Sequence, residues 1–216
     1  MRKIPNLFVR DWNGDRERVR PEVEAVSRWV LMGDGVPTVK RDGTSCLWRD
    51  GRLWKRYDAK HGKAPPAGFV PAQEPDPVTG HFPGWIPVGV GPEDSWHREA
   101  LASNGNSAAA GPNTDDQGCP LLEGQTYELV GPKLQGNPEG LSAHTLIRHG
   151  AEVLWEFPRL WAGMTDADAW VAVVTFLETY RPIEGIVWHH QDGRMAKVKR
   201  RDFGIPWPVR GPGGGA

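Results

Sequence analysis

The chain has 216 residues, enough for one domain with a substantial core. Its formal net charge of −1 provides no overall attraction to nucleic acid or to a membrane surface, so any contact with nucleic acid must come from a local basic patch. Two cysteines exclude a disulfide framework, and no apolar run has the length of a signal peptide or a membrane span, so we expect a cytoplasmic protein with no membrane partner.

The first predicted element is a short helix over residues 21–32, because Pro21 precedes apolar residues at roughly helical spacing. Strand patterns follow it. Residues 44–57 contain two apolar-polar runs around an Asp-Gly pair and predict a hairpin in which Leu47 faces Trp54.

The middle of the chain is predicted to be less regular. Residues 64–97 are rich in Pro, Gly and Trp, and we expect ordered but irregular structure there. Residues 101–118 are small and polar and predict a flexible loop inside the domain, while the glycine-rich tail at 209–216 predicts disorder.

Regular elements are predicted again toward the C-terminus. Residues 125–131 predict a strand, and residues 166–180 predict a helix with Thr165 or Asp166 as its N-cap. Two further strands are joined at an Asp-Gly pair near residue 192 and form a second hairpin.

This second hairpin can be given a register. A two-residue turn pairs Trp188 with Lys197 and Ile186 with Lys199, and alternation then places Glu184 on the same face as both lysines. Ala196, which precedes Lys197, and Val198, which lies between the two lysines, are predicted to point into the core. A slip of one residue would break this arrangement.

Four short segments occur in a set order along the chain: KRDG at 40, YELVG at 127, EGIV at 184 and KVK at 197. A single Lys-x-Asp-Gly is weak evidence, but the four in this order resemble motifs I, III, IV and V of the covalent nucleotidyltransferases, the superfamily of ATP-dependent ligases and mRNA capping enzymes. Within it, the chain is most similar to a small family of RNA ligases over roughly residues 3–208.

The resemblance implies an α+β nucleotidyltransferase (adenylation) domain over residues 1–208, built of antiparallel sheets flanked by helices, with no C-terminal OB-fold. It also implies an ATP-dependent RNA ligase that joins 5′-phosphate and 3′-hydroxyl ends through a lysyl-AMP and an adenylylated 5′ end, as in RNA repair.

By resemblance, Lys40 is the nucleophile, and Asp42 and Gly43 form the bend that presents it to ATP. A lysine amine must be neutral to attack, and neighbouring cations lower a lysine pKa. Cationic residues for this task, which would also neutralise the phosphates, are Lys197, Lys199 and Arg56, with Arg56 in the place of the motif Ia arginine.

Two glutamates complete the predicted site. Glu184 is the expected ligand of Mg²⁺ or Mn²⁺, and Glu128 is expected to contact the ribose and to assist at the metal. Basic residues predicted to contact RNA phosphates in a salt-dependent manner are Lys60, Lys63, Lys133, Arg148, Arg200 and Arg201.

Simpler interpretations stay open for each residue. The Asp-Gly at 42 is typical of a surface turn, residues 197–201 of a solvated edge strand, and Glu184 could pair with Arg201 at the surface. Glu128 could be an exposed strand glutamate, and Arg56 competes with Lys55 and Lys60 for its role.

Other functions also stay open. They are a DNA nick ligase, a GTP-using capping-type nucleotidyltransferase, and a binding module for nucleotide or RNA that has lost its chemistry. The capping reaction is disfavoured by the expected lack of an OB-fold.

Overall fold

The computed structural model describes residues 1–59, 63–77, 79–102, 112–158, 160, 162–180 and 183–208. The predictions for Lys60, for most of the loop at 101–118 and for the tail at 209–216 lie outside these residues. The chain divides into two compact units, the first formed by Met1–Lys3 with Asp42–His149 and the second by Ile4–Arg41 with Gly150–Ala216. Both units combine antiparallel sheets with a few helices, which confirms the α+β class.

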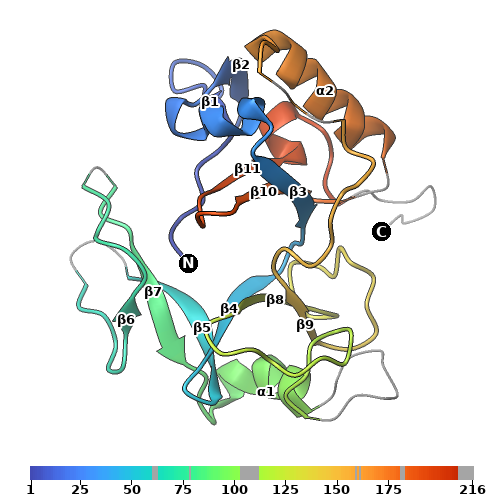
Figure 1. Cartoon of the computed structure of the whole chain (residues 1–216). Helices are drawn as coiled ribbons and strands as arrows, with labels where there is room; N and C mark the ends of the chain where they lie inside the picture. Colours follow the sequence, from blue (N-terminus) through green and yellow to red (C-terminus); the bar gives the residue numbers. More distant parts are fainter. Residues whose placement is uncertain are drawn as a thin grey trace, which may run out of the picture. The chain divides into compact units, whose positions relative to one another are not determined.

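The first unit is built on a six-stranded antiparallel sheet of order β6-β7-β5-β4-β8-β9 (Figure 1). Its strands are β4 (Thr44–Arg49), β5 (Arg52–Ala59), β6 (Val70–Pro71), β7 (Phe82–Pro87), β8 (Thr126–Val130) and β9 (Thr145–Arg148). A 3₁₀ turn, η2 (Pro92–Asp94), leads into the helix α1 (Ser95–Ala102). Two predictions are confirmed: β8 is the expected strand, and Leu47 pairs with Trp54 in the β4–β5 hairpin.

The prediction of irregular structure over 64–97 is only partly right, because β7 lies inside the sheet and α1 begins at Ser95. Prolines normally argue against a strand. Here Pro83 and Pro87 pair with β5. On its other side β7 pairs only with the two residues of β6, so few of its backbone N–H groups are needed as donors there. Gly84 is also required, since a Cβ there would lie 2.3 Å from the ring of Phe69.

One face of this sheet forms the core of the first unit. Cys46, Leu53, Tyr127 and Leu129 are buried there together with Ala100 of α1. Strand alternation therefore leaves Ser45, Arg56 and Glu128 on the other face.

The second unit contains a two-stranded sheet, β1 (Phe8–Arg10) with β2 (Val19–Val23), and a three-stranded sheet of order β11-β10-β3. The strands of the larger sheet are β3 (Gly35–Lys40), β10 (Gly185–His190) and β11 (Met195–Lys199). Its helices are η1 (Ala25–Met32), α2 (Asp166–Thr179) and η3 (Arg200–Phe203), of which η1 and η3 are 3₁₀ helices. Buried side chains of these strands pack with Val173 and Leu177 of α2.

The helix predictions have mixed outcomes. Thr165 caps α2 through a capping box with Asp168, as expected from the sequence. The helix predicted over 21–32 is only partly right, because its first residues belong to β2 and the remainder is the 3₁₀ helix η1. The apolar spacing correctly indicated a helical segment with one buried side, but this segment is a 3₁₀ helix that buries Trp29, Val30 and Leu31.

The predicted register of the second hairpin is wrong by one residue. Val187, not Trp188, pairs with Lys197, and Gly185 pairs with Lys199. The lysines nevertheless share a face, because Ala196 and Val198 are buried on the other side as predicted. Glu184 escapes the alternation because it precedes β10 and is not part of the strand.

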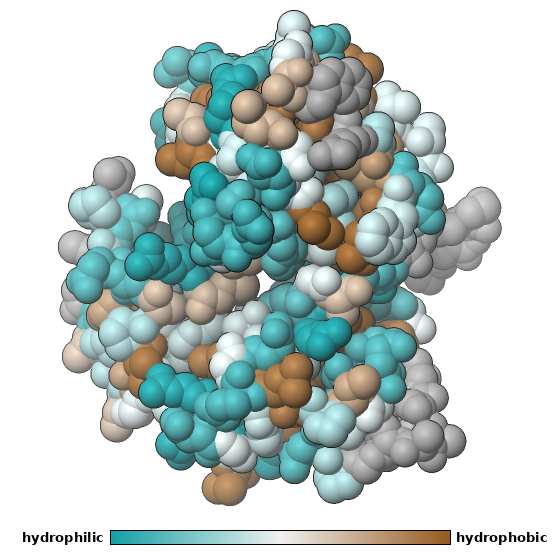
Figure 2. All heavy atoms as spheres, viewed as in Figure 1, coloured by the Kyte–Doolittle hydropathy of each residue, from teal (hydrophilic) through white to brown (hydrophobic). Residues whose placement is uncertain are grey.

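None of the helices in the described ranges is both long and apolar enough to cross a membrane. The face of the molecule seen in Figure 2 is mostly hydrophilic, with hydrophobic residues in separate small groups.

Gly185 is central to the three-stranded sheet. It pairs with Lys199 on one side and with Lys40 on the other. A Cβ at this position would lie 2.0 Å from the carbonyl oxygen of Val198, a distance that backbone atoms cannot accommodate.

We therefore expect Gly185→Ala to destabilise the fold by about 3 kcal/mol or more, measured by urea or thermal unfolding. Gly89→Ala is the matched control, because its Cβ would lie 3.4 Å from its nearest neighbour, Asp94, and its effect should stay within about 1 kcal/mol. Equal stability of the two variants would contradict the packing argument.

Candidate functional site

A cluster of one carboxylate and three ammonium groups lies in the second unit. Lys40 ends β3, Glu184 immediately precedes β10, and Lys197 and Lys199 project from β11. One oxygen of Glu184 pairs with Nζ of Lys40, and the other lies 3.1 Å from Nζ of Lys199. Nζ of Lys40 also donates to the carbonyl oxygen of Arg41 at 3.1 Å. The structure thus brings together the predicted residues of motifs I, IV and V.

The sheet explains this proximity. β10 is the central strand, so the residue at its start lies between the ends of β3 and β11. Gly185 pairs with a lysine on each side and has no side chain of its own, so the carboxylate of Glu184 can reach both Lys40 and Lys199. The side chain of Glu184 is only 6% exposed, which excludes the simpler interpretation of a surface pair with Arg201.

Lys197 differs from the other two lysines. Its side chain makes no hydrogen bond or ion pair with any residue that the structure describes. The pKa of Lys197 is lowered to about 8, chiefly by burial and then by the charges of Lys199 and Lys40, against the opposing effect of Glu184 and Asp202. Lys197 is therefore a cation whose charge is only partly compensated.

The cluster as a whole favours an anion. Three ammonium groups face one carboxylate. The nearby acid, Asp202, is used elsewhere: it lies 3.2 Å from Arg10 and accepts the backbone N–H of Lys199 at 2.8 Å. β11 is not a freely solvated edge either, because its backbone at Lys197 bonds to Pro5 and Leu7. A phosphate group would supply the missing negative charge.

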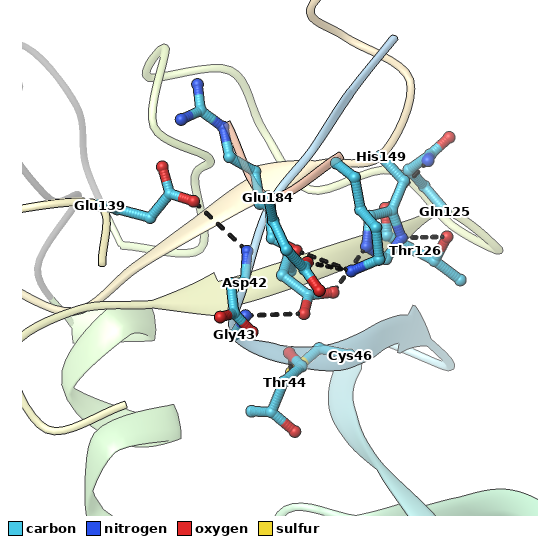
Figure 3. Close-up of polar contacts among 12 residues, drawn as sticks. Asp42, Gly43, Thr44, Cys46, Gln125, Thr126, Glu139, His149 and Glu184 are labelled. Carbon is cyan, nitrogen blue, oxygen red and sulfur yellow. Dashed lines mark hydrogen bonds and ion pairs between the residues drawn. The ribbon is translucent and has the colours of Figure 1, made fainter. Parts of the chain in front are cut away.

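A second polar network lies in the first unit. Glu128 of β8 is 9% exposed, so it is not a solvated strand glutamate. One carboxylate oxygen accepts the N–H of Gly43 at 3.1 Å, and the other lies 2.9 Å from Nε2 of His149. Nδ1 of His149 lies 2.9 Å from Oγ1 of Thr126 (Figure 3). The carboxylate of Glu128 is therefore held from two directions.

Motif I passes from one unit to the other, with Lys40 and Arg41 in the second and Asp42 and Gly43 in the first. Gly43 lies in a bend, but its φ is not in the left-handed region. A Cβ there would lie 2.1 Å from the carbonyl oxygen of Leu129, so glycine is required by close contact with β8. The N–H of Asp42 is bonded to Glu139 at 3.3 Å (Figure 3).

Arg56 lies on the same face of the six-stranded sheet as Glu128. β4 separates the two strands, so their backbones are about 10 Å apart. The guanidinium lies 5.0 Å from the ring of Trp85 and donates to the carbonyl oxygen of Met1 at 2.5 Å, and burial lowers its pKa. The competing residue Lys55 is on the opposite face, 2.5 Å from Asp94, which leaves Arg56 as the better candidate.

The predicted RNA contacts separate by exposure. Lys63, Lys133 and Arg201 are exposed and Arg148 is half-buried, so they stay predictions. Arg200 is 5% exposed, and its guanidinium donates to the main-chain carbonyls of Ile183 and Leu177. Arg200 therefore has a structural role, and we remove it from the set of RNA contacts.

The described residues offer little to a metal ion on their own. They contain no group of three His, Cys, Asp or Glu side chains that could hold one. Both oxygens of Glu184 face lysines, and both oxygens of Glu128 have partners in the first unit. Mg²⁺ in such surroundings would need most of its ligands from water and phosphate oxygens.

Sequence reasoning missed His149 and Thr126 as parts of the site. Both contacts depend on the pairing of β8 with β9, which no motif encodes. His149 lies directly after β9, and its side chain is bound to Glu128.

The burial of Lys197 has a consequence for stability. At pH 7 Lys197 is charged in the folded and the unfolded chain, so the folded state carries the full cost of its partial desolvation. We expect Lys197→Met to stabilise the protein by about 2 kcal/mol at pH 7. The side chain of Lys197 loses its proton near pH 8 in the folded chain and near pH 10.5 in the unfolded chain. The stabilisation by Lys197→Met should therefore shrink as pH rises between these values.

Unfolding midpoints from pH 6.5 to 10.5 would test this. Lys199→Met is the matched control, because it removes a partner of buried Glu184 and should destabilise the fold. The prediction is contradicted if Lys197→Met is no more stable than the parent at pH 7. It is also contradicted if the difference in stability between the two proteins does not decrease as pH rises.

Comparison with known proteins identifies the family of the chain. A family model described as RNA ligase 1 matches residues 70–212. The RNA ligase 1 proteins of Danio rerio, Mus musculus and Pongo abelii are 33%, 30% and 29% identical to the chain, and each alignment covers 96% of this chain and 82% of the relative. The RNA ligase family suggested by the order of the four motifs is thereby confirmed, and the chain belongs to the RNA ligase 1 family.

Proposed function

We propose that the protein is an ATP-dependent RNA ligase that joins 5′-phosphate and 3′-hydroxyl ends through a lysyl-AMP intermediate. The observation that carries the proposal is the cluster around Glu184, in which the motif lysine Lys40 lies among an excess of cations. Membership of the RNA ligase 1 family supports RNA as the substrate class.

In the first step, Nζ of Lys40 attacks the α-phosphorus of ATP. A nitrogen–phosphorus bond forms, the bond from the α-phosphorus to the bridging oxygen breaks, and pyrophosphate leaves. Lys40 must give up a proton, and the carboxylate of Glu184 is its hydrogen-bond acceptor in the cluster. Lys197 and Lys199 lie on β11, next to β10, and stabilise the charge that develops on the phosphoryl oxygens.

The next two steps use the same kind of displacement. An oxygen of the RNA 5′-phosphate attacks the lysyl-AMP, which releases Lys40 and leaves AMP joined to the RNA through a pyrophosphate link. A 3′-hydroxyl then attacks the 5′-phosphate of the RNA, the strand is sealed, and AMP departs. All three are in-line transfers at phosphorus, so one cationic cluster can serve them.

Mg²⁺ or Mn²⁺ is part of the proposal, with Glu184 or Glu128 contributing at most one ligand or an anchor for its waters. Such an ion would neutralise phosphate charge. RNA phosphates are proposed to contact Lys63, Lys133, Arg148 and Arg201, which are all at least partly exposed. A cytoplasmic location is consistent with the two free cysteines, Cys46 and Cys119.

Incubation with α-³²P-labelled ATP and Mg²⁺ or Mn²⁺ tests the first step, because label should remain on the denatured chain. We expect Lys40→Ala to lose this label by at least about a thousandfold, since no other group can replace the nucleophile. Lys3→Ala, an exposed lysine in the first unit, should label like the parent protein.

Unlabelled parent protein, or label that persists in Lys40→Ala, would refute the lysyl-AMP mechanism. Label from GTP in place of ATP would favour a capping-type transferase. Sealing of nicked DNA, but not of single-stranded RNA with the required ends, would assign the protein to the DNA ligases.

A further inference from the structure

The carboxylate of Glu128 is held by one donor at each oxygen. The N–H of Gly43 and the ring of His149 approach opposite oxygens of the same carboxylate, at 3.1 and 2.9 Å. Thr126 in turn contacts the second nitrogen of the ring, and its strand also binds His149 through the backbone, N–H to carbonyl, at 3.1 Å. The orientation of the Glu128 carboxylate is therefore set by Gly43 and His149, and through the ring by Thr126. These three residues are labelled in Figure 3.

The chemistry of the pair assigns one proton. A carboxylate can only accept, so Nε2 of His149 must carry the hydrogen that it shares with Glu128. The hydroxyl of Thr126 can donate to Nδ1 or accept from it, so it supports the ring as neutral imidazole or as imidazolium. Donation from His149 to Glu128 is thus maintained in both protonation states of the ring.

The carboxylate keeps free capacity. An ionised carboxylate has about four acceptor positions, and these contacts use two of them, one on each oxygen. The side chain of Glu128 is 12% exposed, so the remaining positions are restricted to a narrow approach. A pair of neighbouring hydroxyls, such as the 2′- and 3′-hydroxyls of a ribose, can donate to two acceptor positions on one carboxylate, and the motif resemblance implies a ribose contact for Glu128.

We propose that His149 is a positioning residue for the nucleotide: it orients Glu128 so that the carboxylate accepts from the ribose hydroxyls and thereby selects ribonucleotides over 2′-deoxyribonucleotides. The inference rests on the proposed function, in which ATP is the first substrate. It adds the residue that sets ribose selectivity, and Thr126 supports that residue through Nδ1.

Equilibrium binding of ATP and 2′-deoxy-ATP separates this inference from the ligase proposal. The measurements use the full chain with Lys40→Ala, which cannot form the covalent adduct, so calorimetry reports binding alone. His149→Gln places an amide N–H close to the position of Nε2 and should keep the preference for ATP. His149→Asn places its amide nearer the position of Nδ1. It should reduce the preference for ATP about tenfold, chiefly by weakening the binding of ATP.

Two controls show that the effect passes through Glu128. His81→Asn is matched, because His81 forms a similar pair with Asp58 at 2.6 Å in the same unit, and it should leave the ATP preference unchanged. Glu128→Gln should lose most of the preference, and adding His149→Asn to it should have no further effect. Thermal unfolding of each variant confirms that the measured protein is folded.

The inference is overturned if folded His149→Asn discriminates between the two nucleotides as well as His149→Gln does. It is also overturned if the effects of Glu128→Gln and His149→Asn simply add, or if neither nucleotide binds. The ligase proposal fails on a different result, the absence of label on Lys40, so the two can be refuted separately.

Discussion

The buried carboxylate of Glu184 is the constraint on which the rest of the site depends. A glutamate that is 6% exposed must be neutralised, and here Lys40 and Lys199 approach its two oxygens. That arrangement holds the end of β3 and the end of β11 around the start of β10. It also leaves Lys197 as a cation whose charge is only partly compensated, and its pKa is lowered to about 8 chiefly by burial. The site therefore stores unfavourable electrostatics that a phosphate would relieve.

The two motif glycines have a common physical basis. Gly185 lies against the backbone of β11 and Gly43 against the backbone of β8, and at both positions a Cβ would be within 2.1 Å of a carbonyl oxygen. Each of these motifs thus contains a glycine because the chain passes close to a neighbouring strand there. Gly43 further donates its N–H to Glu128, so its position also helps to orient an acid of the proposed nucleotide site.

The failures of prediction have identifiable causes. β7 escaped detection because Pro83, Gly84 and Pro87 argue against a strand, although its neighbours in the sheet accommodate them. The hairpin at Asp192 was assigned a register one residue off, because a loop length cannot be derived from an Asp-Gly pair alone. Arg200 was taken for a surface cation, since local sequence does not reveal that two buried main-chain carbonyls need its donors.

The sequence by itself determined the family, the strand pattern of the hairpins, the capped helix α2, and the identities of Lys40, Glu184, Lys197 and Lys199. These follow from local composition, alternation and the order of motifs, which are properties of short segments. Only the tertiary structure decided that Glu184 lies between Lys40 and Lys199, that Lys197 has no hydrogen-bond or ion-pair partner among the described residues, and that His149 contacts Glu128. These relations depend on pairing between strands far apart in the chain, and on burial, which no local pattern contains.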